Sequence, residues 1–234
     1  DGKYVAYYRF DERAVKEFTM TVYKNEMYPE YQTFKYPKVG EQNATVSVFI
    51  YNVDSKTNIQ ADLPVDPELY TPRIKWANPE HGLCVTMMNR HQNRLSLNLV
   101  DPTTGDSKIL LEEKNKYYID VTDNLTFLKD GESFVWTSEM DGYNHVYRYD
   151  MSGTLMNQIT KGPWELTSFY GVDEDNELIY FQSTEEGSTE RYVYEIGMDG
   201  KKRRKMTPAK GWNSAQFSST YDYYVLNHSA LDKA

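Results

Sequence analysis

The sequence predicts an all-β protein, part of a β-propeller built from four-stranded antiparallel sheets (blades), and three observations carry this prediction. Short stretches of alternating apolar and polar residues are separated by clusters of Asp, Asn and Gly, the pattern of antiparallel strands joined by turns. Aromatic residues make up 15% of the chain, with 21 Tyr against 9 Phe, and tyrosine suits sheet surfaces where its ring packs and its hydroxyl reaches water. The pattern also recurs, at a spacing of about 45 residues.

The recurrence is clearest when residues 130–160 are compared with the segment that begins at Asp175. The matched pairs are Asp130 with Asp175, Phe134 with Ile179, Trp136 with Phe181, Ser138 with Ser183, Gly142 with Gly187, Tyr147 with Tyr192 and Tyr149 with Tyr194. The closing pair Ile159-Thr160 meets Met206-Thr207 only after a slip of two residues. A period of about 40–50 residues with four short strands is typical of propeller blades, because one such sheet cannot cover both of its own faces.

The segments before this repeat predict one partial and one complete blade. The partial blade has a turn at 1–3, a strand that ends at 11, a strand at 46–51 and a turn at 54–57. A polar passage to 72 follows, and the complete blade lies within 74–111. The opening turn and strand match the start of the repeat at 130–136. We therefore expect the chain to begin inside a blade and to be a piece of a longer protein.

The later segments complete the count. Blades begin at Asp130 and Asp175, with candidate strands at 117–119 and 166–170 ahead of them, and residues 217–227 open a further blade. This gives about three full blades and two partial ones, within a single propeller domain that occupies residues 1–234. The best helix candidate, at 11–19, predicts one short helical turn at most.

Residues 16–42 interrupt the repeat and predict a projecting hairpin, which we call the arm. Its segments 18–23 and 31–36 alternate as strands do, and 25–29 read as the turn between them. The arm is rich in aromatic residues of the kind that anchor protein interfaces. The candidate interface residues are Tyr23, Tyr28, Pro29, Tyr31, Phe34 and Tyr36.

Composition and motifs argue against several classes of function. The formal net charge is -9, so a nucleic-acid partner is not expected, and the basic run 201–205 is expected to be a solvated hairpin edge. The single cysteine, Cys84, excludes an internal disulfide and a paired-cysteine metal site, and its apolar neighbours predict a buried thiol. No apolar run is long enough to span a bilayer.

Motifs for catalysis are missing from the sequence. It contains no GxSxG, HExxH, P-loop or GxGxxG pattern, so we expect no catalytic residue, no metal site and no cofactor in this chain. The acidic pairs Glu112-Glu113 and Glu185-Glu186 are expected to be solvated loop carboxylates. The four histidines are expected at the surface or at strand ends: His81, His91, His145 and His228.

Several motifs occur in an order that matches one known family. They are the strand that ends at 9–11, the arm, the run YPKVGEQN at 36–43, the turn DGYNH at 141–145 and the run TKGPWE at 160–165. In these features the chain resembles the propeller domain of the dipeptidyl peptidase IV group of the prolyl oligopeptidase family of serine peptidases. The resemblance implies an eight-bladed parent propeller that covers an α/β-hydrolase domain and admits short or unfolded peptides to a Ser-Asp-His triad.

The resemblance also implies a function for the parent protein, which would remove X-Pro or X-Ala dipeptides from peptide N-termini. The triad and the paired glutamates that bind the substrate ammonium would both lie outside this chain. The implied partners are peptide substrates, the hydrolase domain of the same chain, and a second copy bound through the arm. The implied location is periplasmic or extracellular, with or without a membrane anchor.

Three questions stay open at this point. Where family members can carry a substrate-lining Arg-Phe-Arg run, this chain has Lys116-Tyr117-Tyr118, so Tyr117 and Tyr118 are candidates for lining the pocket, with ordinary strand packing as the alternative. A close relative that releases tripeptides or single residues is a second possibility for the activity. A stand-alone binding propeller of the WD-repeat or TolB-like kind, with no peptidase activity, is the alternative from another class.

Overall fold

The computed structural model describes residues 2–78 and 81–231, which contain strands, turns and loops and no helix. Asp1, which the sequence places in the first turn, lies outside the described residues. The chain forms two compact units, Asp1–Ile119 and Asp120–Ala234.

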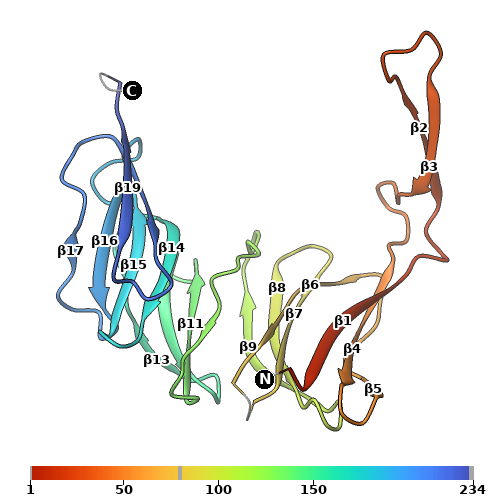
Figure 1. Cartoon of the computed structure of the whole chain (residues 1–234), viewed down its shortest axis with the longest axis horizontal. Helices are drawn as coiled ribbons and strands as arrows, with labels where there is room; N and C mark the ends of the chain where they lie inside the picture. Colours follow the sequence, from red (N-terminus) through yellow and green to blue (C-terminus); the bar gives the residue numbers. More distant parts are fainter. Residues whose placement is uncertain (1, 79–80, 232–234) are drawn as a thin grey trace. The chain divides into compact units, whose positions relative to one another are not determined.

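The first unit contains two sheets and the arm (Figure 1). A three-stranded sheet has the order β1 (Tyr4–Asp11), β4 (Thr45–Asn52), β5 (Thr57–Gln60). A four-stranded sheet follows, with β6 (Leu69–Trp76), β7 (Leu83–Asn89), β8 (Arg94–Val100) and β9 (Ser107–Lys114). The arm is the antiparallel pair β2 (Glu17–Val22) and β3 (Glu30–Lys35), inserted between β1 and β4, and it extends away from their sheet (Figure 1).

The second unit contains two four-stranded sheets and one pair of strands. The first sheet has β10 (Thr126–Phe127), β11 (Ser133–Ser138), β12 (His145–Asp150) and β13 (Leu155–Gln158). The second has β14 (Leu166–Asp173), β15 (Leu178–Ser183), β16 (Tyr192–Gly197) and β17 (Arg204–Lys205). The pair is β18 (Trp212–Phe217) and β19 (Tyr224–Ser229). The described residues thus hold three complete four-stranded blades and two partial ones, which confirms the predicted count.

Three predicted elements differ from those in the structure. Residues 117–119 are a loop and not a strand, and the buried Ile119 is fixed there by its N–H, which donates to the Gln92 carbonyl at 2.8 Å. The expected polar passage to residue 72 already contains β5 and the start of β6. The segment proposed for a helical turn forms a turn at 12–15 and then enters β2, because its residues continue the ladder of the arm.

The register of the sheets corrects the predicted match between blades. Trp136 pairs with Tyr147 on β12, and the equivalent Phe181 pairs with Tyr194 on β16. Tyr147 therefore corresponds to Tyr194, and not to Tyr192 as the fixed spacing predicted. The two additional residues lie in the turn between β15 and β16, so the slip seen at Thr207 begins earlier in the chain than the sequence comparison placed it.

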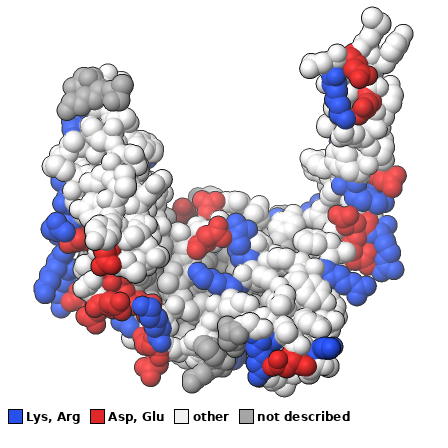
Figure 2. Space-filling model, in the orientation of Figure 1, with Lys and Arg blue, Asp and Glu red and all other residues white. Residues whose placement is uncertain are grey.

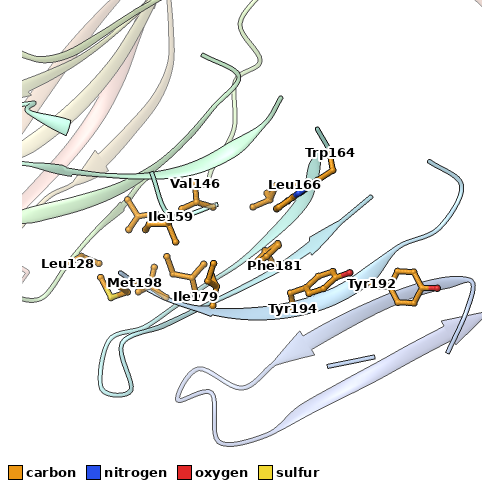
Figure 3. Close-up of a cluster of buried hydrophobic side chains, with 13 residues drawn as sticks. Leu128, Val146, Ile159, Trp164, Leu166, Ile179, Phe181, Tyr192, Tyr194 and Met198 are labelled. Carbon is orange, nitrogen blue, oxygen red and sulfur yellow. The ribbon is translucent and has the colours of Figure 1, made fainter. Parts of the chain in front are cut away.

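The core of the second unit lies between two neighbouring blades. Figure 3 shows Val146 of β12 facing Ile179 and Phe181 of β15, and all three side chains are fully buried. Trp164, Phe181 and Tyr194 stack in sequence, with ring centroids 5.9 and 5.5 Å apart. Each blade therefore covers a face of the next, which is how propeller sheets bury their apolar side chains.

The first unit buries a separate cluster. Val48 and Ile50 of β4 pack with Leu83, Val85 and Met87 of β7, so here too the core joins two neighbouring sheets. Cys84, between these residues on β7, is buried and makes no disulfide, as the sequence predicted.

Candidate functional site

The arm presents an aromatic cluster near its base. Antiparallel pairing places Phe18 of β2 directly opposite Phe34 of β3, and their ring centroids lie 6.0 Å apart. Tyr36, just after β3, completes a triangle with distances of 6.0 and 6.1 Å to these two rings. The Lys38 ammonium lies 3.8 Å from the centroid of the Phe18 ring, close enough for a cation–π interaction.

The tip of the arm exposes a second group of large side chains. Tyr28 is 80% exposed and Tyr31 is 72% exposed, and Tyr23 and Met27 are also exposed. In Figure 2 the outer end of the arm is mostly white, with a few charged side chains below it. Large aromatic and methionine side chains exposed together at the end of a hairpin often mark a site of protein association.

Local interactions shape the hairpin that carries these side chains. The Thr19 and Thr33 hydroxyls face each other across the strands at 2.9 Å, and the Lys24 ammonium meets the Glu30 carboxylate at 2.6 Å beside the turn. Asn25 adopts φ 55°, a left-handed conformation that asparagine tolerates better than most residues. A two-stranded hairpin is marginal by itself, so the arm depends on these contacts and on its attachment to the blade.

The structure divides the six predicted arm residues into two groups. Phe34 and Tyr36 belong to the aromatic cluster at the base, whereas Tyr23, Tyr28 and Tyr31 lie toward the tip, with half-buried Pro29 beside them. The sequence interpretation did not single out Phe18, Lys38 and Met27. Alternation places Phe18 on the same face of the hairpin as Phe34, a signal that could have identified it. The sequence holds no comparable signal for Lys38.

Tyr117 and Tyr118 lie in the loop after β9. Their side chains are 77% and 47% exposed, so packing within a strand does not account for them. The Tyr117 N–H donates to Asn115 Oδ1 at 2.9 Å, and the Lys116 ammonium lies 5.1 Å from the Tyr117 ring. Both rings are thus available to a ligand, and their place in a substrate pocket stays a prediction.

The loop position expected for the acidic pairs holds for Glu185-Glu186, between β15 and β16, but is wrong for Glu112-Glu113, which lie in β9. Glu185 meets Arg203 at 2.7 Å and Glu186 meets Lys205 at 2.9 Å, along the edge strand of their blade. Glu112 lies 3.8 Å from Lys114 on β9. The basic run therefore lies at a sheet edge, as predicted.

The described part of the chain holds neither a metal-binding cluster nor a membrane-spanning helix. No group of three His, Cys, Asp or Glu side chains there could hold a metal ion. No helix there is long and apolar enough to cross a membrane.

His145 lies at a strand end, one of the two positions expected for the histidines, but it is buried and not at the surface. It begins β12 and is fully buried, with Nδ1 3.1 Å from Thr160 Oγ1 and Nε2 3.0 Å from the Gly162 carbonyl. Because a carbonyl can only accept, Nε2 carries the hydrogen, and Nδ1 accepts from the Thr160 hydroxyl. The imidazole is also perpendicular to the Trp164 ring, with ring centroids 4.6 Å apart. These contacts give His145 a structural role, joining β12 to the loop before β14.

Comparisons with known proteins agree on one family. The family model described as "Dipeptidyl peptidase IV (DPP IV) N-terminal region" matches residues 1–234. Dipeptidyl peptidase 4 of Trichophyton rubrum is 31% identical over 97% of this chain and 31% of its own length. Probable dipeptidyl peptidase 4 of Aspergillus fumigatus is 30% identical over 99% of this chain and 32% of its own length. The chain therefore spans about a third of the length of these relatives.

Solved structures give the same result at the level of the fold. The crystal structure of Porphyromonas gingivalis dipeptidyl peptidase 4 has a TM-score of 0.89 and 38% identity, over 97% of this chain and 32% of that protein. A putative dipeptidyl aminopeptidase IV from Bacteroides ovatus has a TM-score of 0.82 over 96% of this chain and 35% of that protein, and at 23% identity it supports the fold alone.

Proposed function

Because the chain belongs to the dipeptidyl peptidase IV N-terminal region family, we propose that it is the non-catalytic propeller part of a serine-type dipeptidyl aminopeptidase. The match over residues 1–234 carries this proposal. The missing GxSxG motif fits it as well, since the nucleophile then belongs to a hydrolase domain of the same protein. The substrates are peptides with Pro or Ala at the second position, and the protein acts in the periplasm or outside the cell, free or membrane-anchored.

In this proposal the propeller controls which peptides reach the triad. Rigid blades with buried cores provide walls that exclude folded proteins, while a short or unfolded peptide can pass. Tyr117 and Tyr118 contribute to the extended substrate pocket, and their exposure supports this role. An aromatic ring offers a flat apolar surface for the side chains of a peptide at little entropic cost.

Hydrolysis by the whole protein is the first test. We expect the full-length protein to release p-nitroaniline from Gly-Pro-p-nitroanilide and residues 1–234 alone to give no turnover. Replacing Tyr117 or Tyr118 with Ala should raise KM for a longer peptide about fivefold with little change in kcat, because ground-state contacts are lost. The matched control is Tyr223→Ala, which removes an exposed tyrosine from the turn before β19.

Three results would contradict this account. Turnover by residues 1–234 alone would show that the chain contains its own nucleophile. Release only from tripeptide substrates would assign the protein to the tripeptidyl alternative. If the KM values of Tyr117→Ala and Tyr118→Ala equal that of Tyr223→Ala, the two tyrosines do not line the substrate pocket.

We further propose that the arm binds a second copy of the protein. The support is the exposed aromatic surface at the tip, where Tyr28 and Tyr31 offer the large, rigid side chains that often carry binding energy at interfaces. The neighbouring Met27 adds a flexible apolar side chain that adapts to a partner surface.

Removal of this surface should give a monomer. We expect deletion of residues 21–34, or the double change Tyr28→Ala and Tyr31→Ala, to abolish the dimer in sedimentation velocity and light scattering. The β-type circular dichroism should stay unchanged, because the arm lies outside the cores of the blades. Tyr223→Ala again serves as the control, and a dimer that persists in the double variant rules out the arm as the interface.

A further inference from the structure

Glu41 joins the two chain segments that connect the arm to its blade. It lies in a turn after β3, where its N–H donates to the Lys38 carbonyl at 3.0 Å and its Oε2 accepts from the Lys38 N–H at 2.9 Å. Its Oε1 accepts from the Lys16 ammonium at 2.6 Å, and Lys16 lies just before β2. One carboxylate therefore ties the segment that enters the arm to the segment that leaves it.

Arg90 ties the same turn to the neighbouring blade. Its Nη2 donates to the Glu41 carbonyl at 2.9 Å, and its Nη1 donates to Glu68 Oε1 at 2.8 Å. The Arg90 N–H also donates to the Glu68 carbonyl at 2.8 Å, which fixes the backbone from which the guanidinium extends. Because Arg90 follows β7, the base of the arm is joined to the four-stranded sheet of the first unit as well as to its own sheet.

Each of these ion pairs has one sheltered member. The side chains of Glu41 and Arg90 are 23% and 25% exposed, while their partners Lys16 and Glu68 are largely exposed. Arg13, which pairs with Asp11 near the same base, is 90% exposed. Hydrogen bonds from Lys16 and from the Lys38 N–H lower the pKa of the Glu41 carboxyl below its ordinary value, so the charged form that both donors need is favoured. Charge-assisted bonds in such partly buried positions are stronger than those of fully exposed pairs.

We infer that Glu41 and Arg90 are positioning residues that fix the direction of the arm, so that its tip is already oriented before a second copy binds. The inference rests on the proposed role of the arm in the dimer. Without these bonds, the base would keep the bond from the Tyr36 N–H to the Lys16 carbonyl at 3.0 Å and the contact of Asn43 with Tyr70, but its turn would lose its charged contacts. Binding would then have to order the loosened connections. A preset arm avoids that entropic cost and therefore tightens association.

Single substitutions at Glu41 and at Arg90 test this role in the full-length protein. Glu41→Gln keeps an oxygen for the Lys38 N–H but loses the charge that holds Lys16, and Arg90→Gln removes the bonds to Glu41 and Glu68. We expect both to raise the dimer dissociation constant about tenfold, as the loss of a charge-assisted bond does. Arg13→Gln is the matched control, because it removes a charge at the base without touching Glu41.

Amide hydrogen exchange distinguishes a loss of arm positioning from a loss of folding and from a loss of dimerisation. Amides of residues 36–43 and of the arm should exchange faster in Glu41→Gln and Arg90→Gln than in Arg13→Gln, while β4 and β7 keep their protection. Faster exchange supports the positioning role even if the unaltered protein sediments as a monomer, a result that would overturn only the proposed dimer. If Glu41→Gln and Arg90→Gln show the same amide exchange and the same dimer affinity as Arg13→Gln, the inference is overturned. If Arg90→Gln unfolds the unit, Arg90→Lys should still show intermediate exchange at 36–43, and unchanged exchange there overturns it too.

Discussion

Cys84 illustrates how burial controls the chemistry of one residue. Burial raises the pKa of its thiol to about 12, because a thiolate would lose its hydration on β7. The thiolate is the nucleophile, so the folded protein should be nearly inert to thiol reagents at neutral pH. We expect Ellman's reagent to label Cys84 at least about a hundredfold more slowly in buffer than in urea.

The pH dependence of this reaction follows from the sign of the shift. The folded pKa exceeds the unfolded value, so the contribution of the thiol to folding is complete below the unfolded pKa and declines as the pH rises toward about 12. Native labelling should therefore remain slow at pH 9, whereas a cysteine placed at exposed Thr189 (Thr189→Cys) should react quickly. Rapid labelling of Cys84 in the native protein would contradict its buried position.

Two threonines accept equivalent backbone hydrogen bonds in successive blades. Thr160 Oγ1 accepts from the Val146 N–H and Thr207 Oγ1 accepts from the Val193 N–H, each at 2.9 Å. The sequence comparison matched these threonines correctly, because both follow an apolar residue at the end of a repeat. It mismatched the tyrosines, since nothing in a polar turn marks where two residues have been added.

At the scale of the element, β14 departs from regular pairing with β15 in two places, and Gly171 lies at one of them. Its φ is +131°, and a Cβ there would overlap the hydroxyl of Tyr221, which stacks on Tyr180 with centroids 5.3 Å apart. We expect Gly171→Ala to lower the free energy of unfolding by about 2–4 kcal/mol through backbone strain and displacement of Tyr221. Urea unfolding measures this change.

Gly187→Ala is the matched control for this substitution. Gly187 lies in the turn between β15 and β16, and the nearest atom to the Cβ of an alanine there would be Glu190 Cγ at 3.8 Å, an ordinary contact with a flexible side chain. Its effect should stay within about 0.5 kcal/mol. Equal urea midpoints for the two variants would mean that β14 can shift away from Tyr221 at no cost.

The arm is the element that the sequence predicted most directly. Its two strands lie one residue earlier than expected, at 17–22 and 30–35 in place of 18–23 and 31–36. Alternation fixes which side chains share a face, so Phe18 and Phe34 meet as the pattern requires. The first and last hydrogen-bonded residues depend on the connections at the base, which alternation does not encode.

At the scale of the whole molecule, charge and core packing are arranged blade by blade. The basic residues beside the edge strand β17 pair with Glu185, Glu186 and Glu195, so this run does not act as a concentrated positive surface. Together with a net charge of -9, this pairing argues against a phosphate-backbone partner. The apolar clusters of each unit span two neighbouring sheets, so a blade gains its stability mainly from its neighbour.

The sequence by itself determined the all-β class, the number of blades, the arm and the family resemblance, because alternation, turn residues and repeated spacing are local signals. The tertiary structure decided the burial of His145, the loop position of Tyr117 and the bond from Arg90 to Glu41. That bond joins residues 49 positions apart and His145 reaches Gly162 across 17, and neither separation leaves a pattern in the intervening residues. Such contacts arise only when the blades have packed, since packing decides which side chains lose water and which partners they then find.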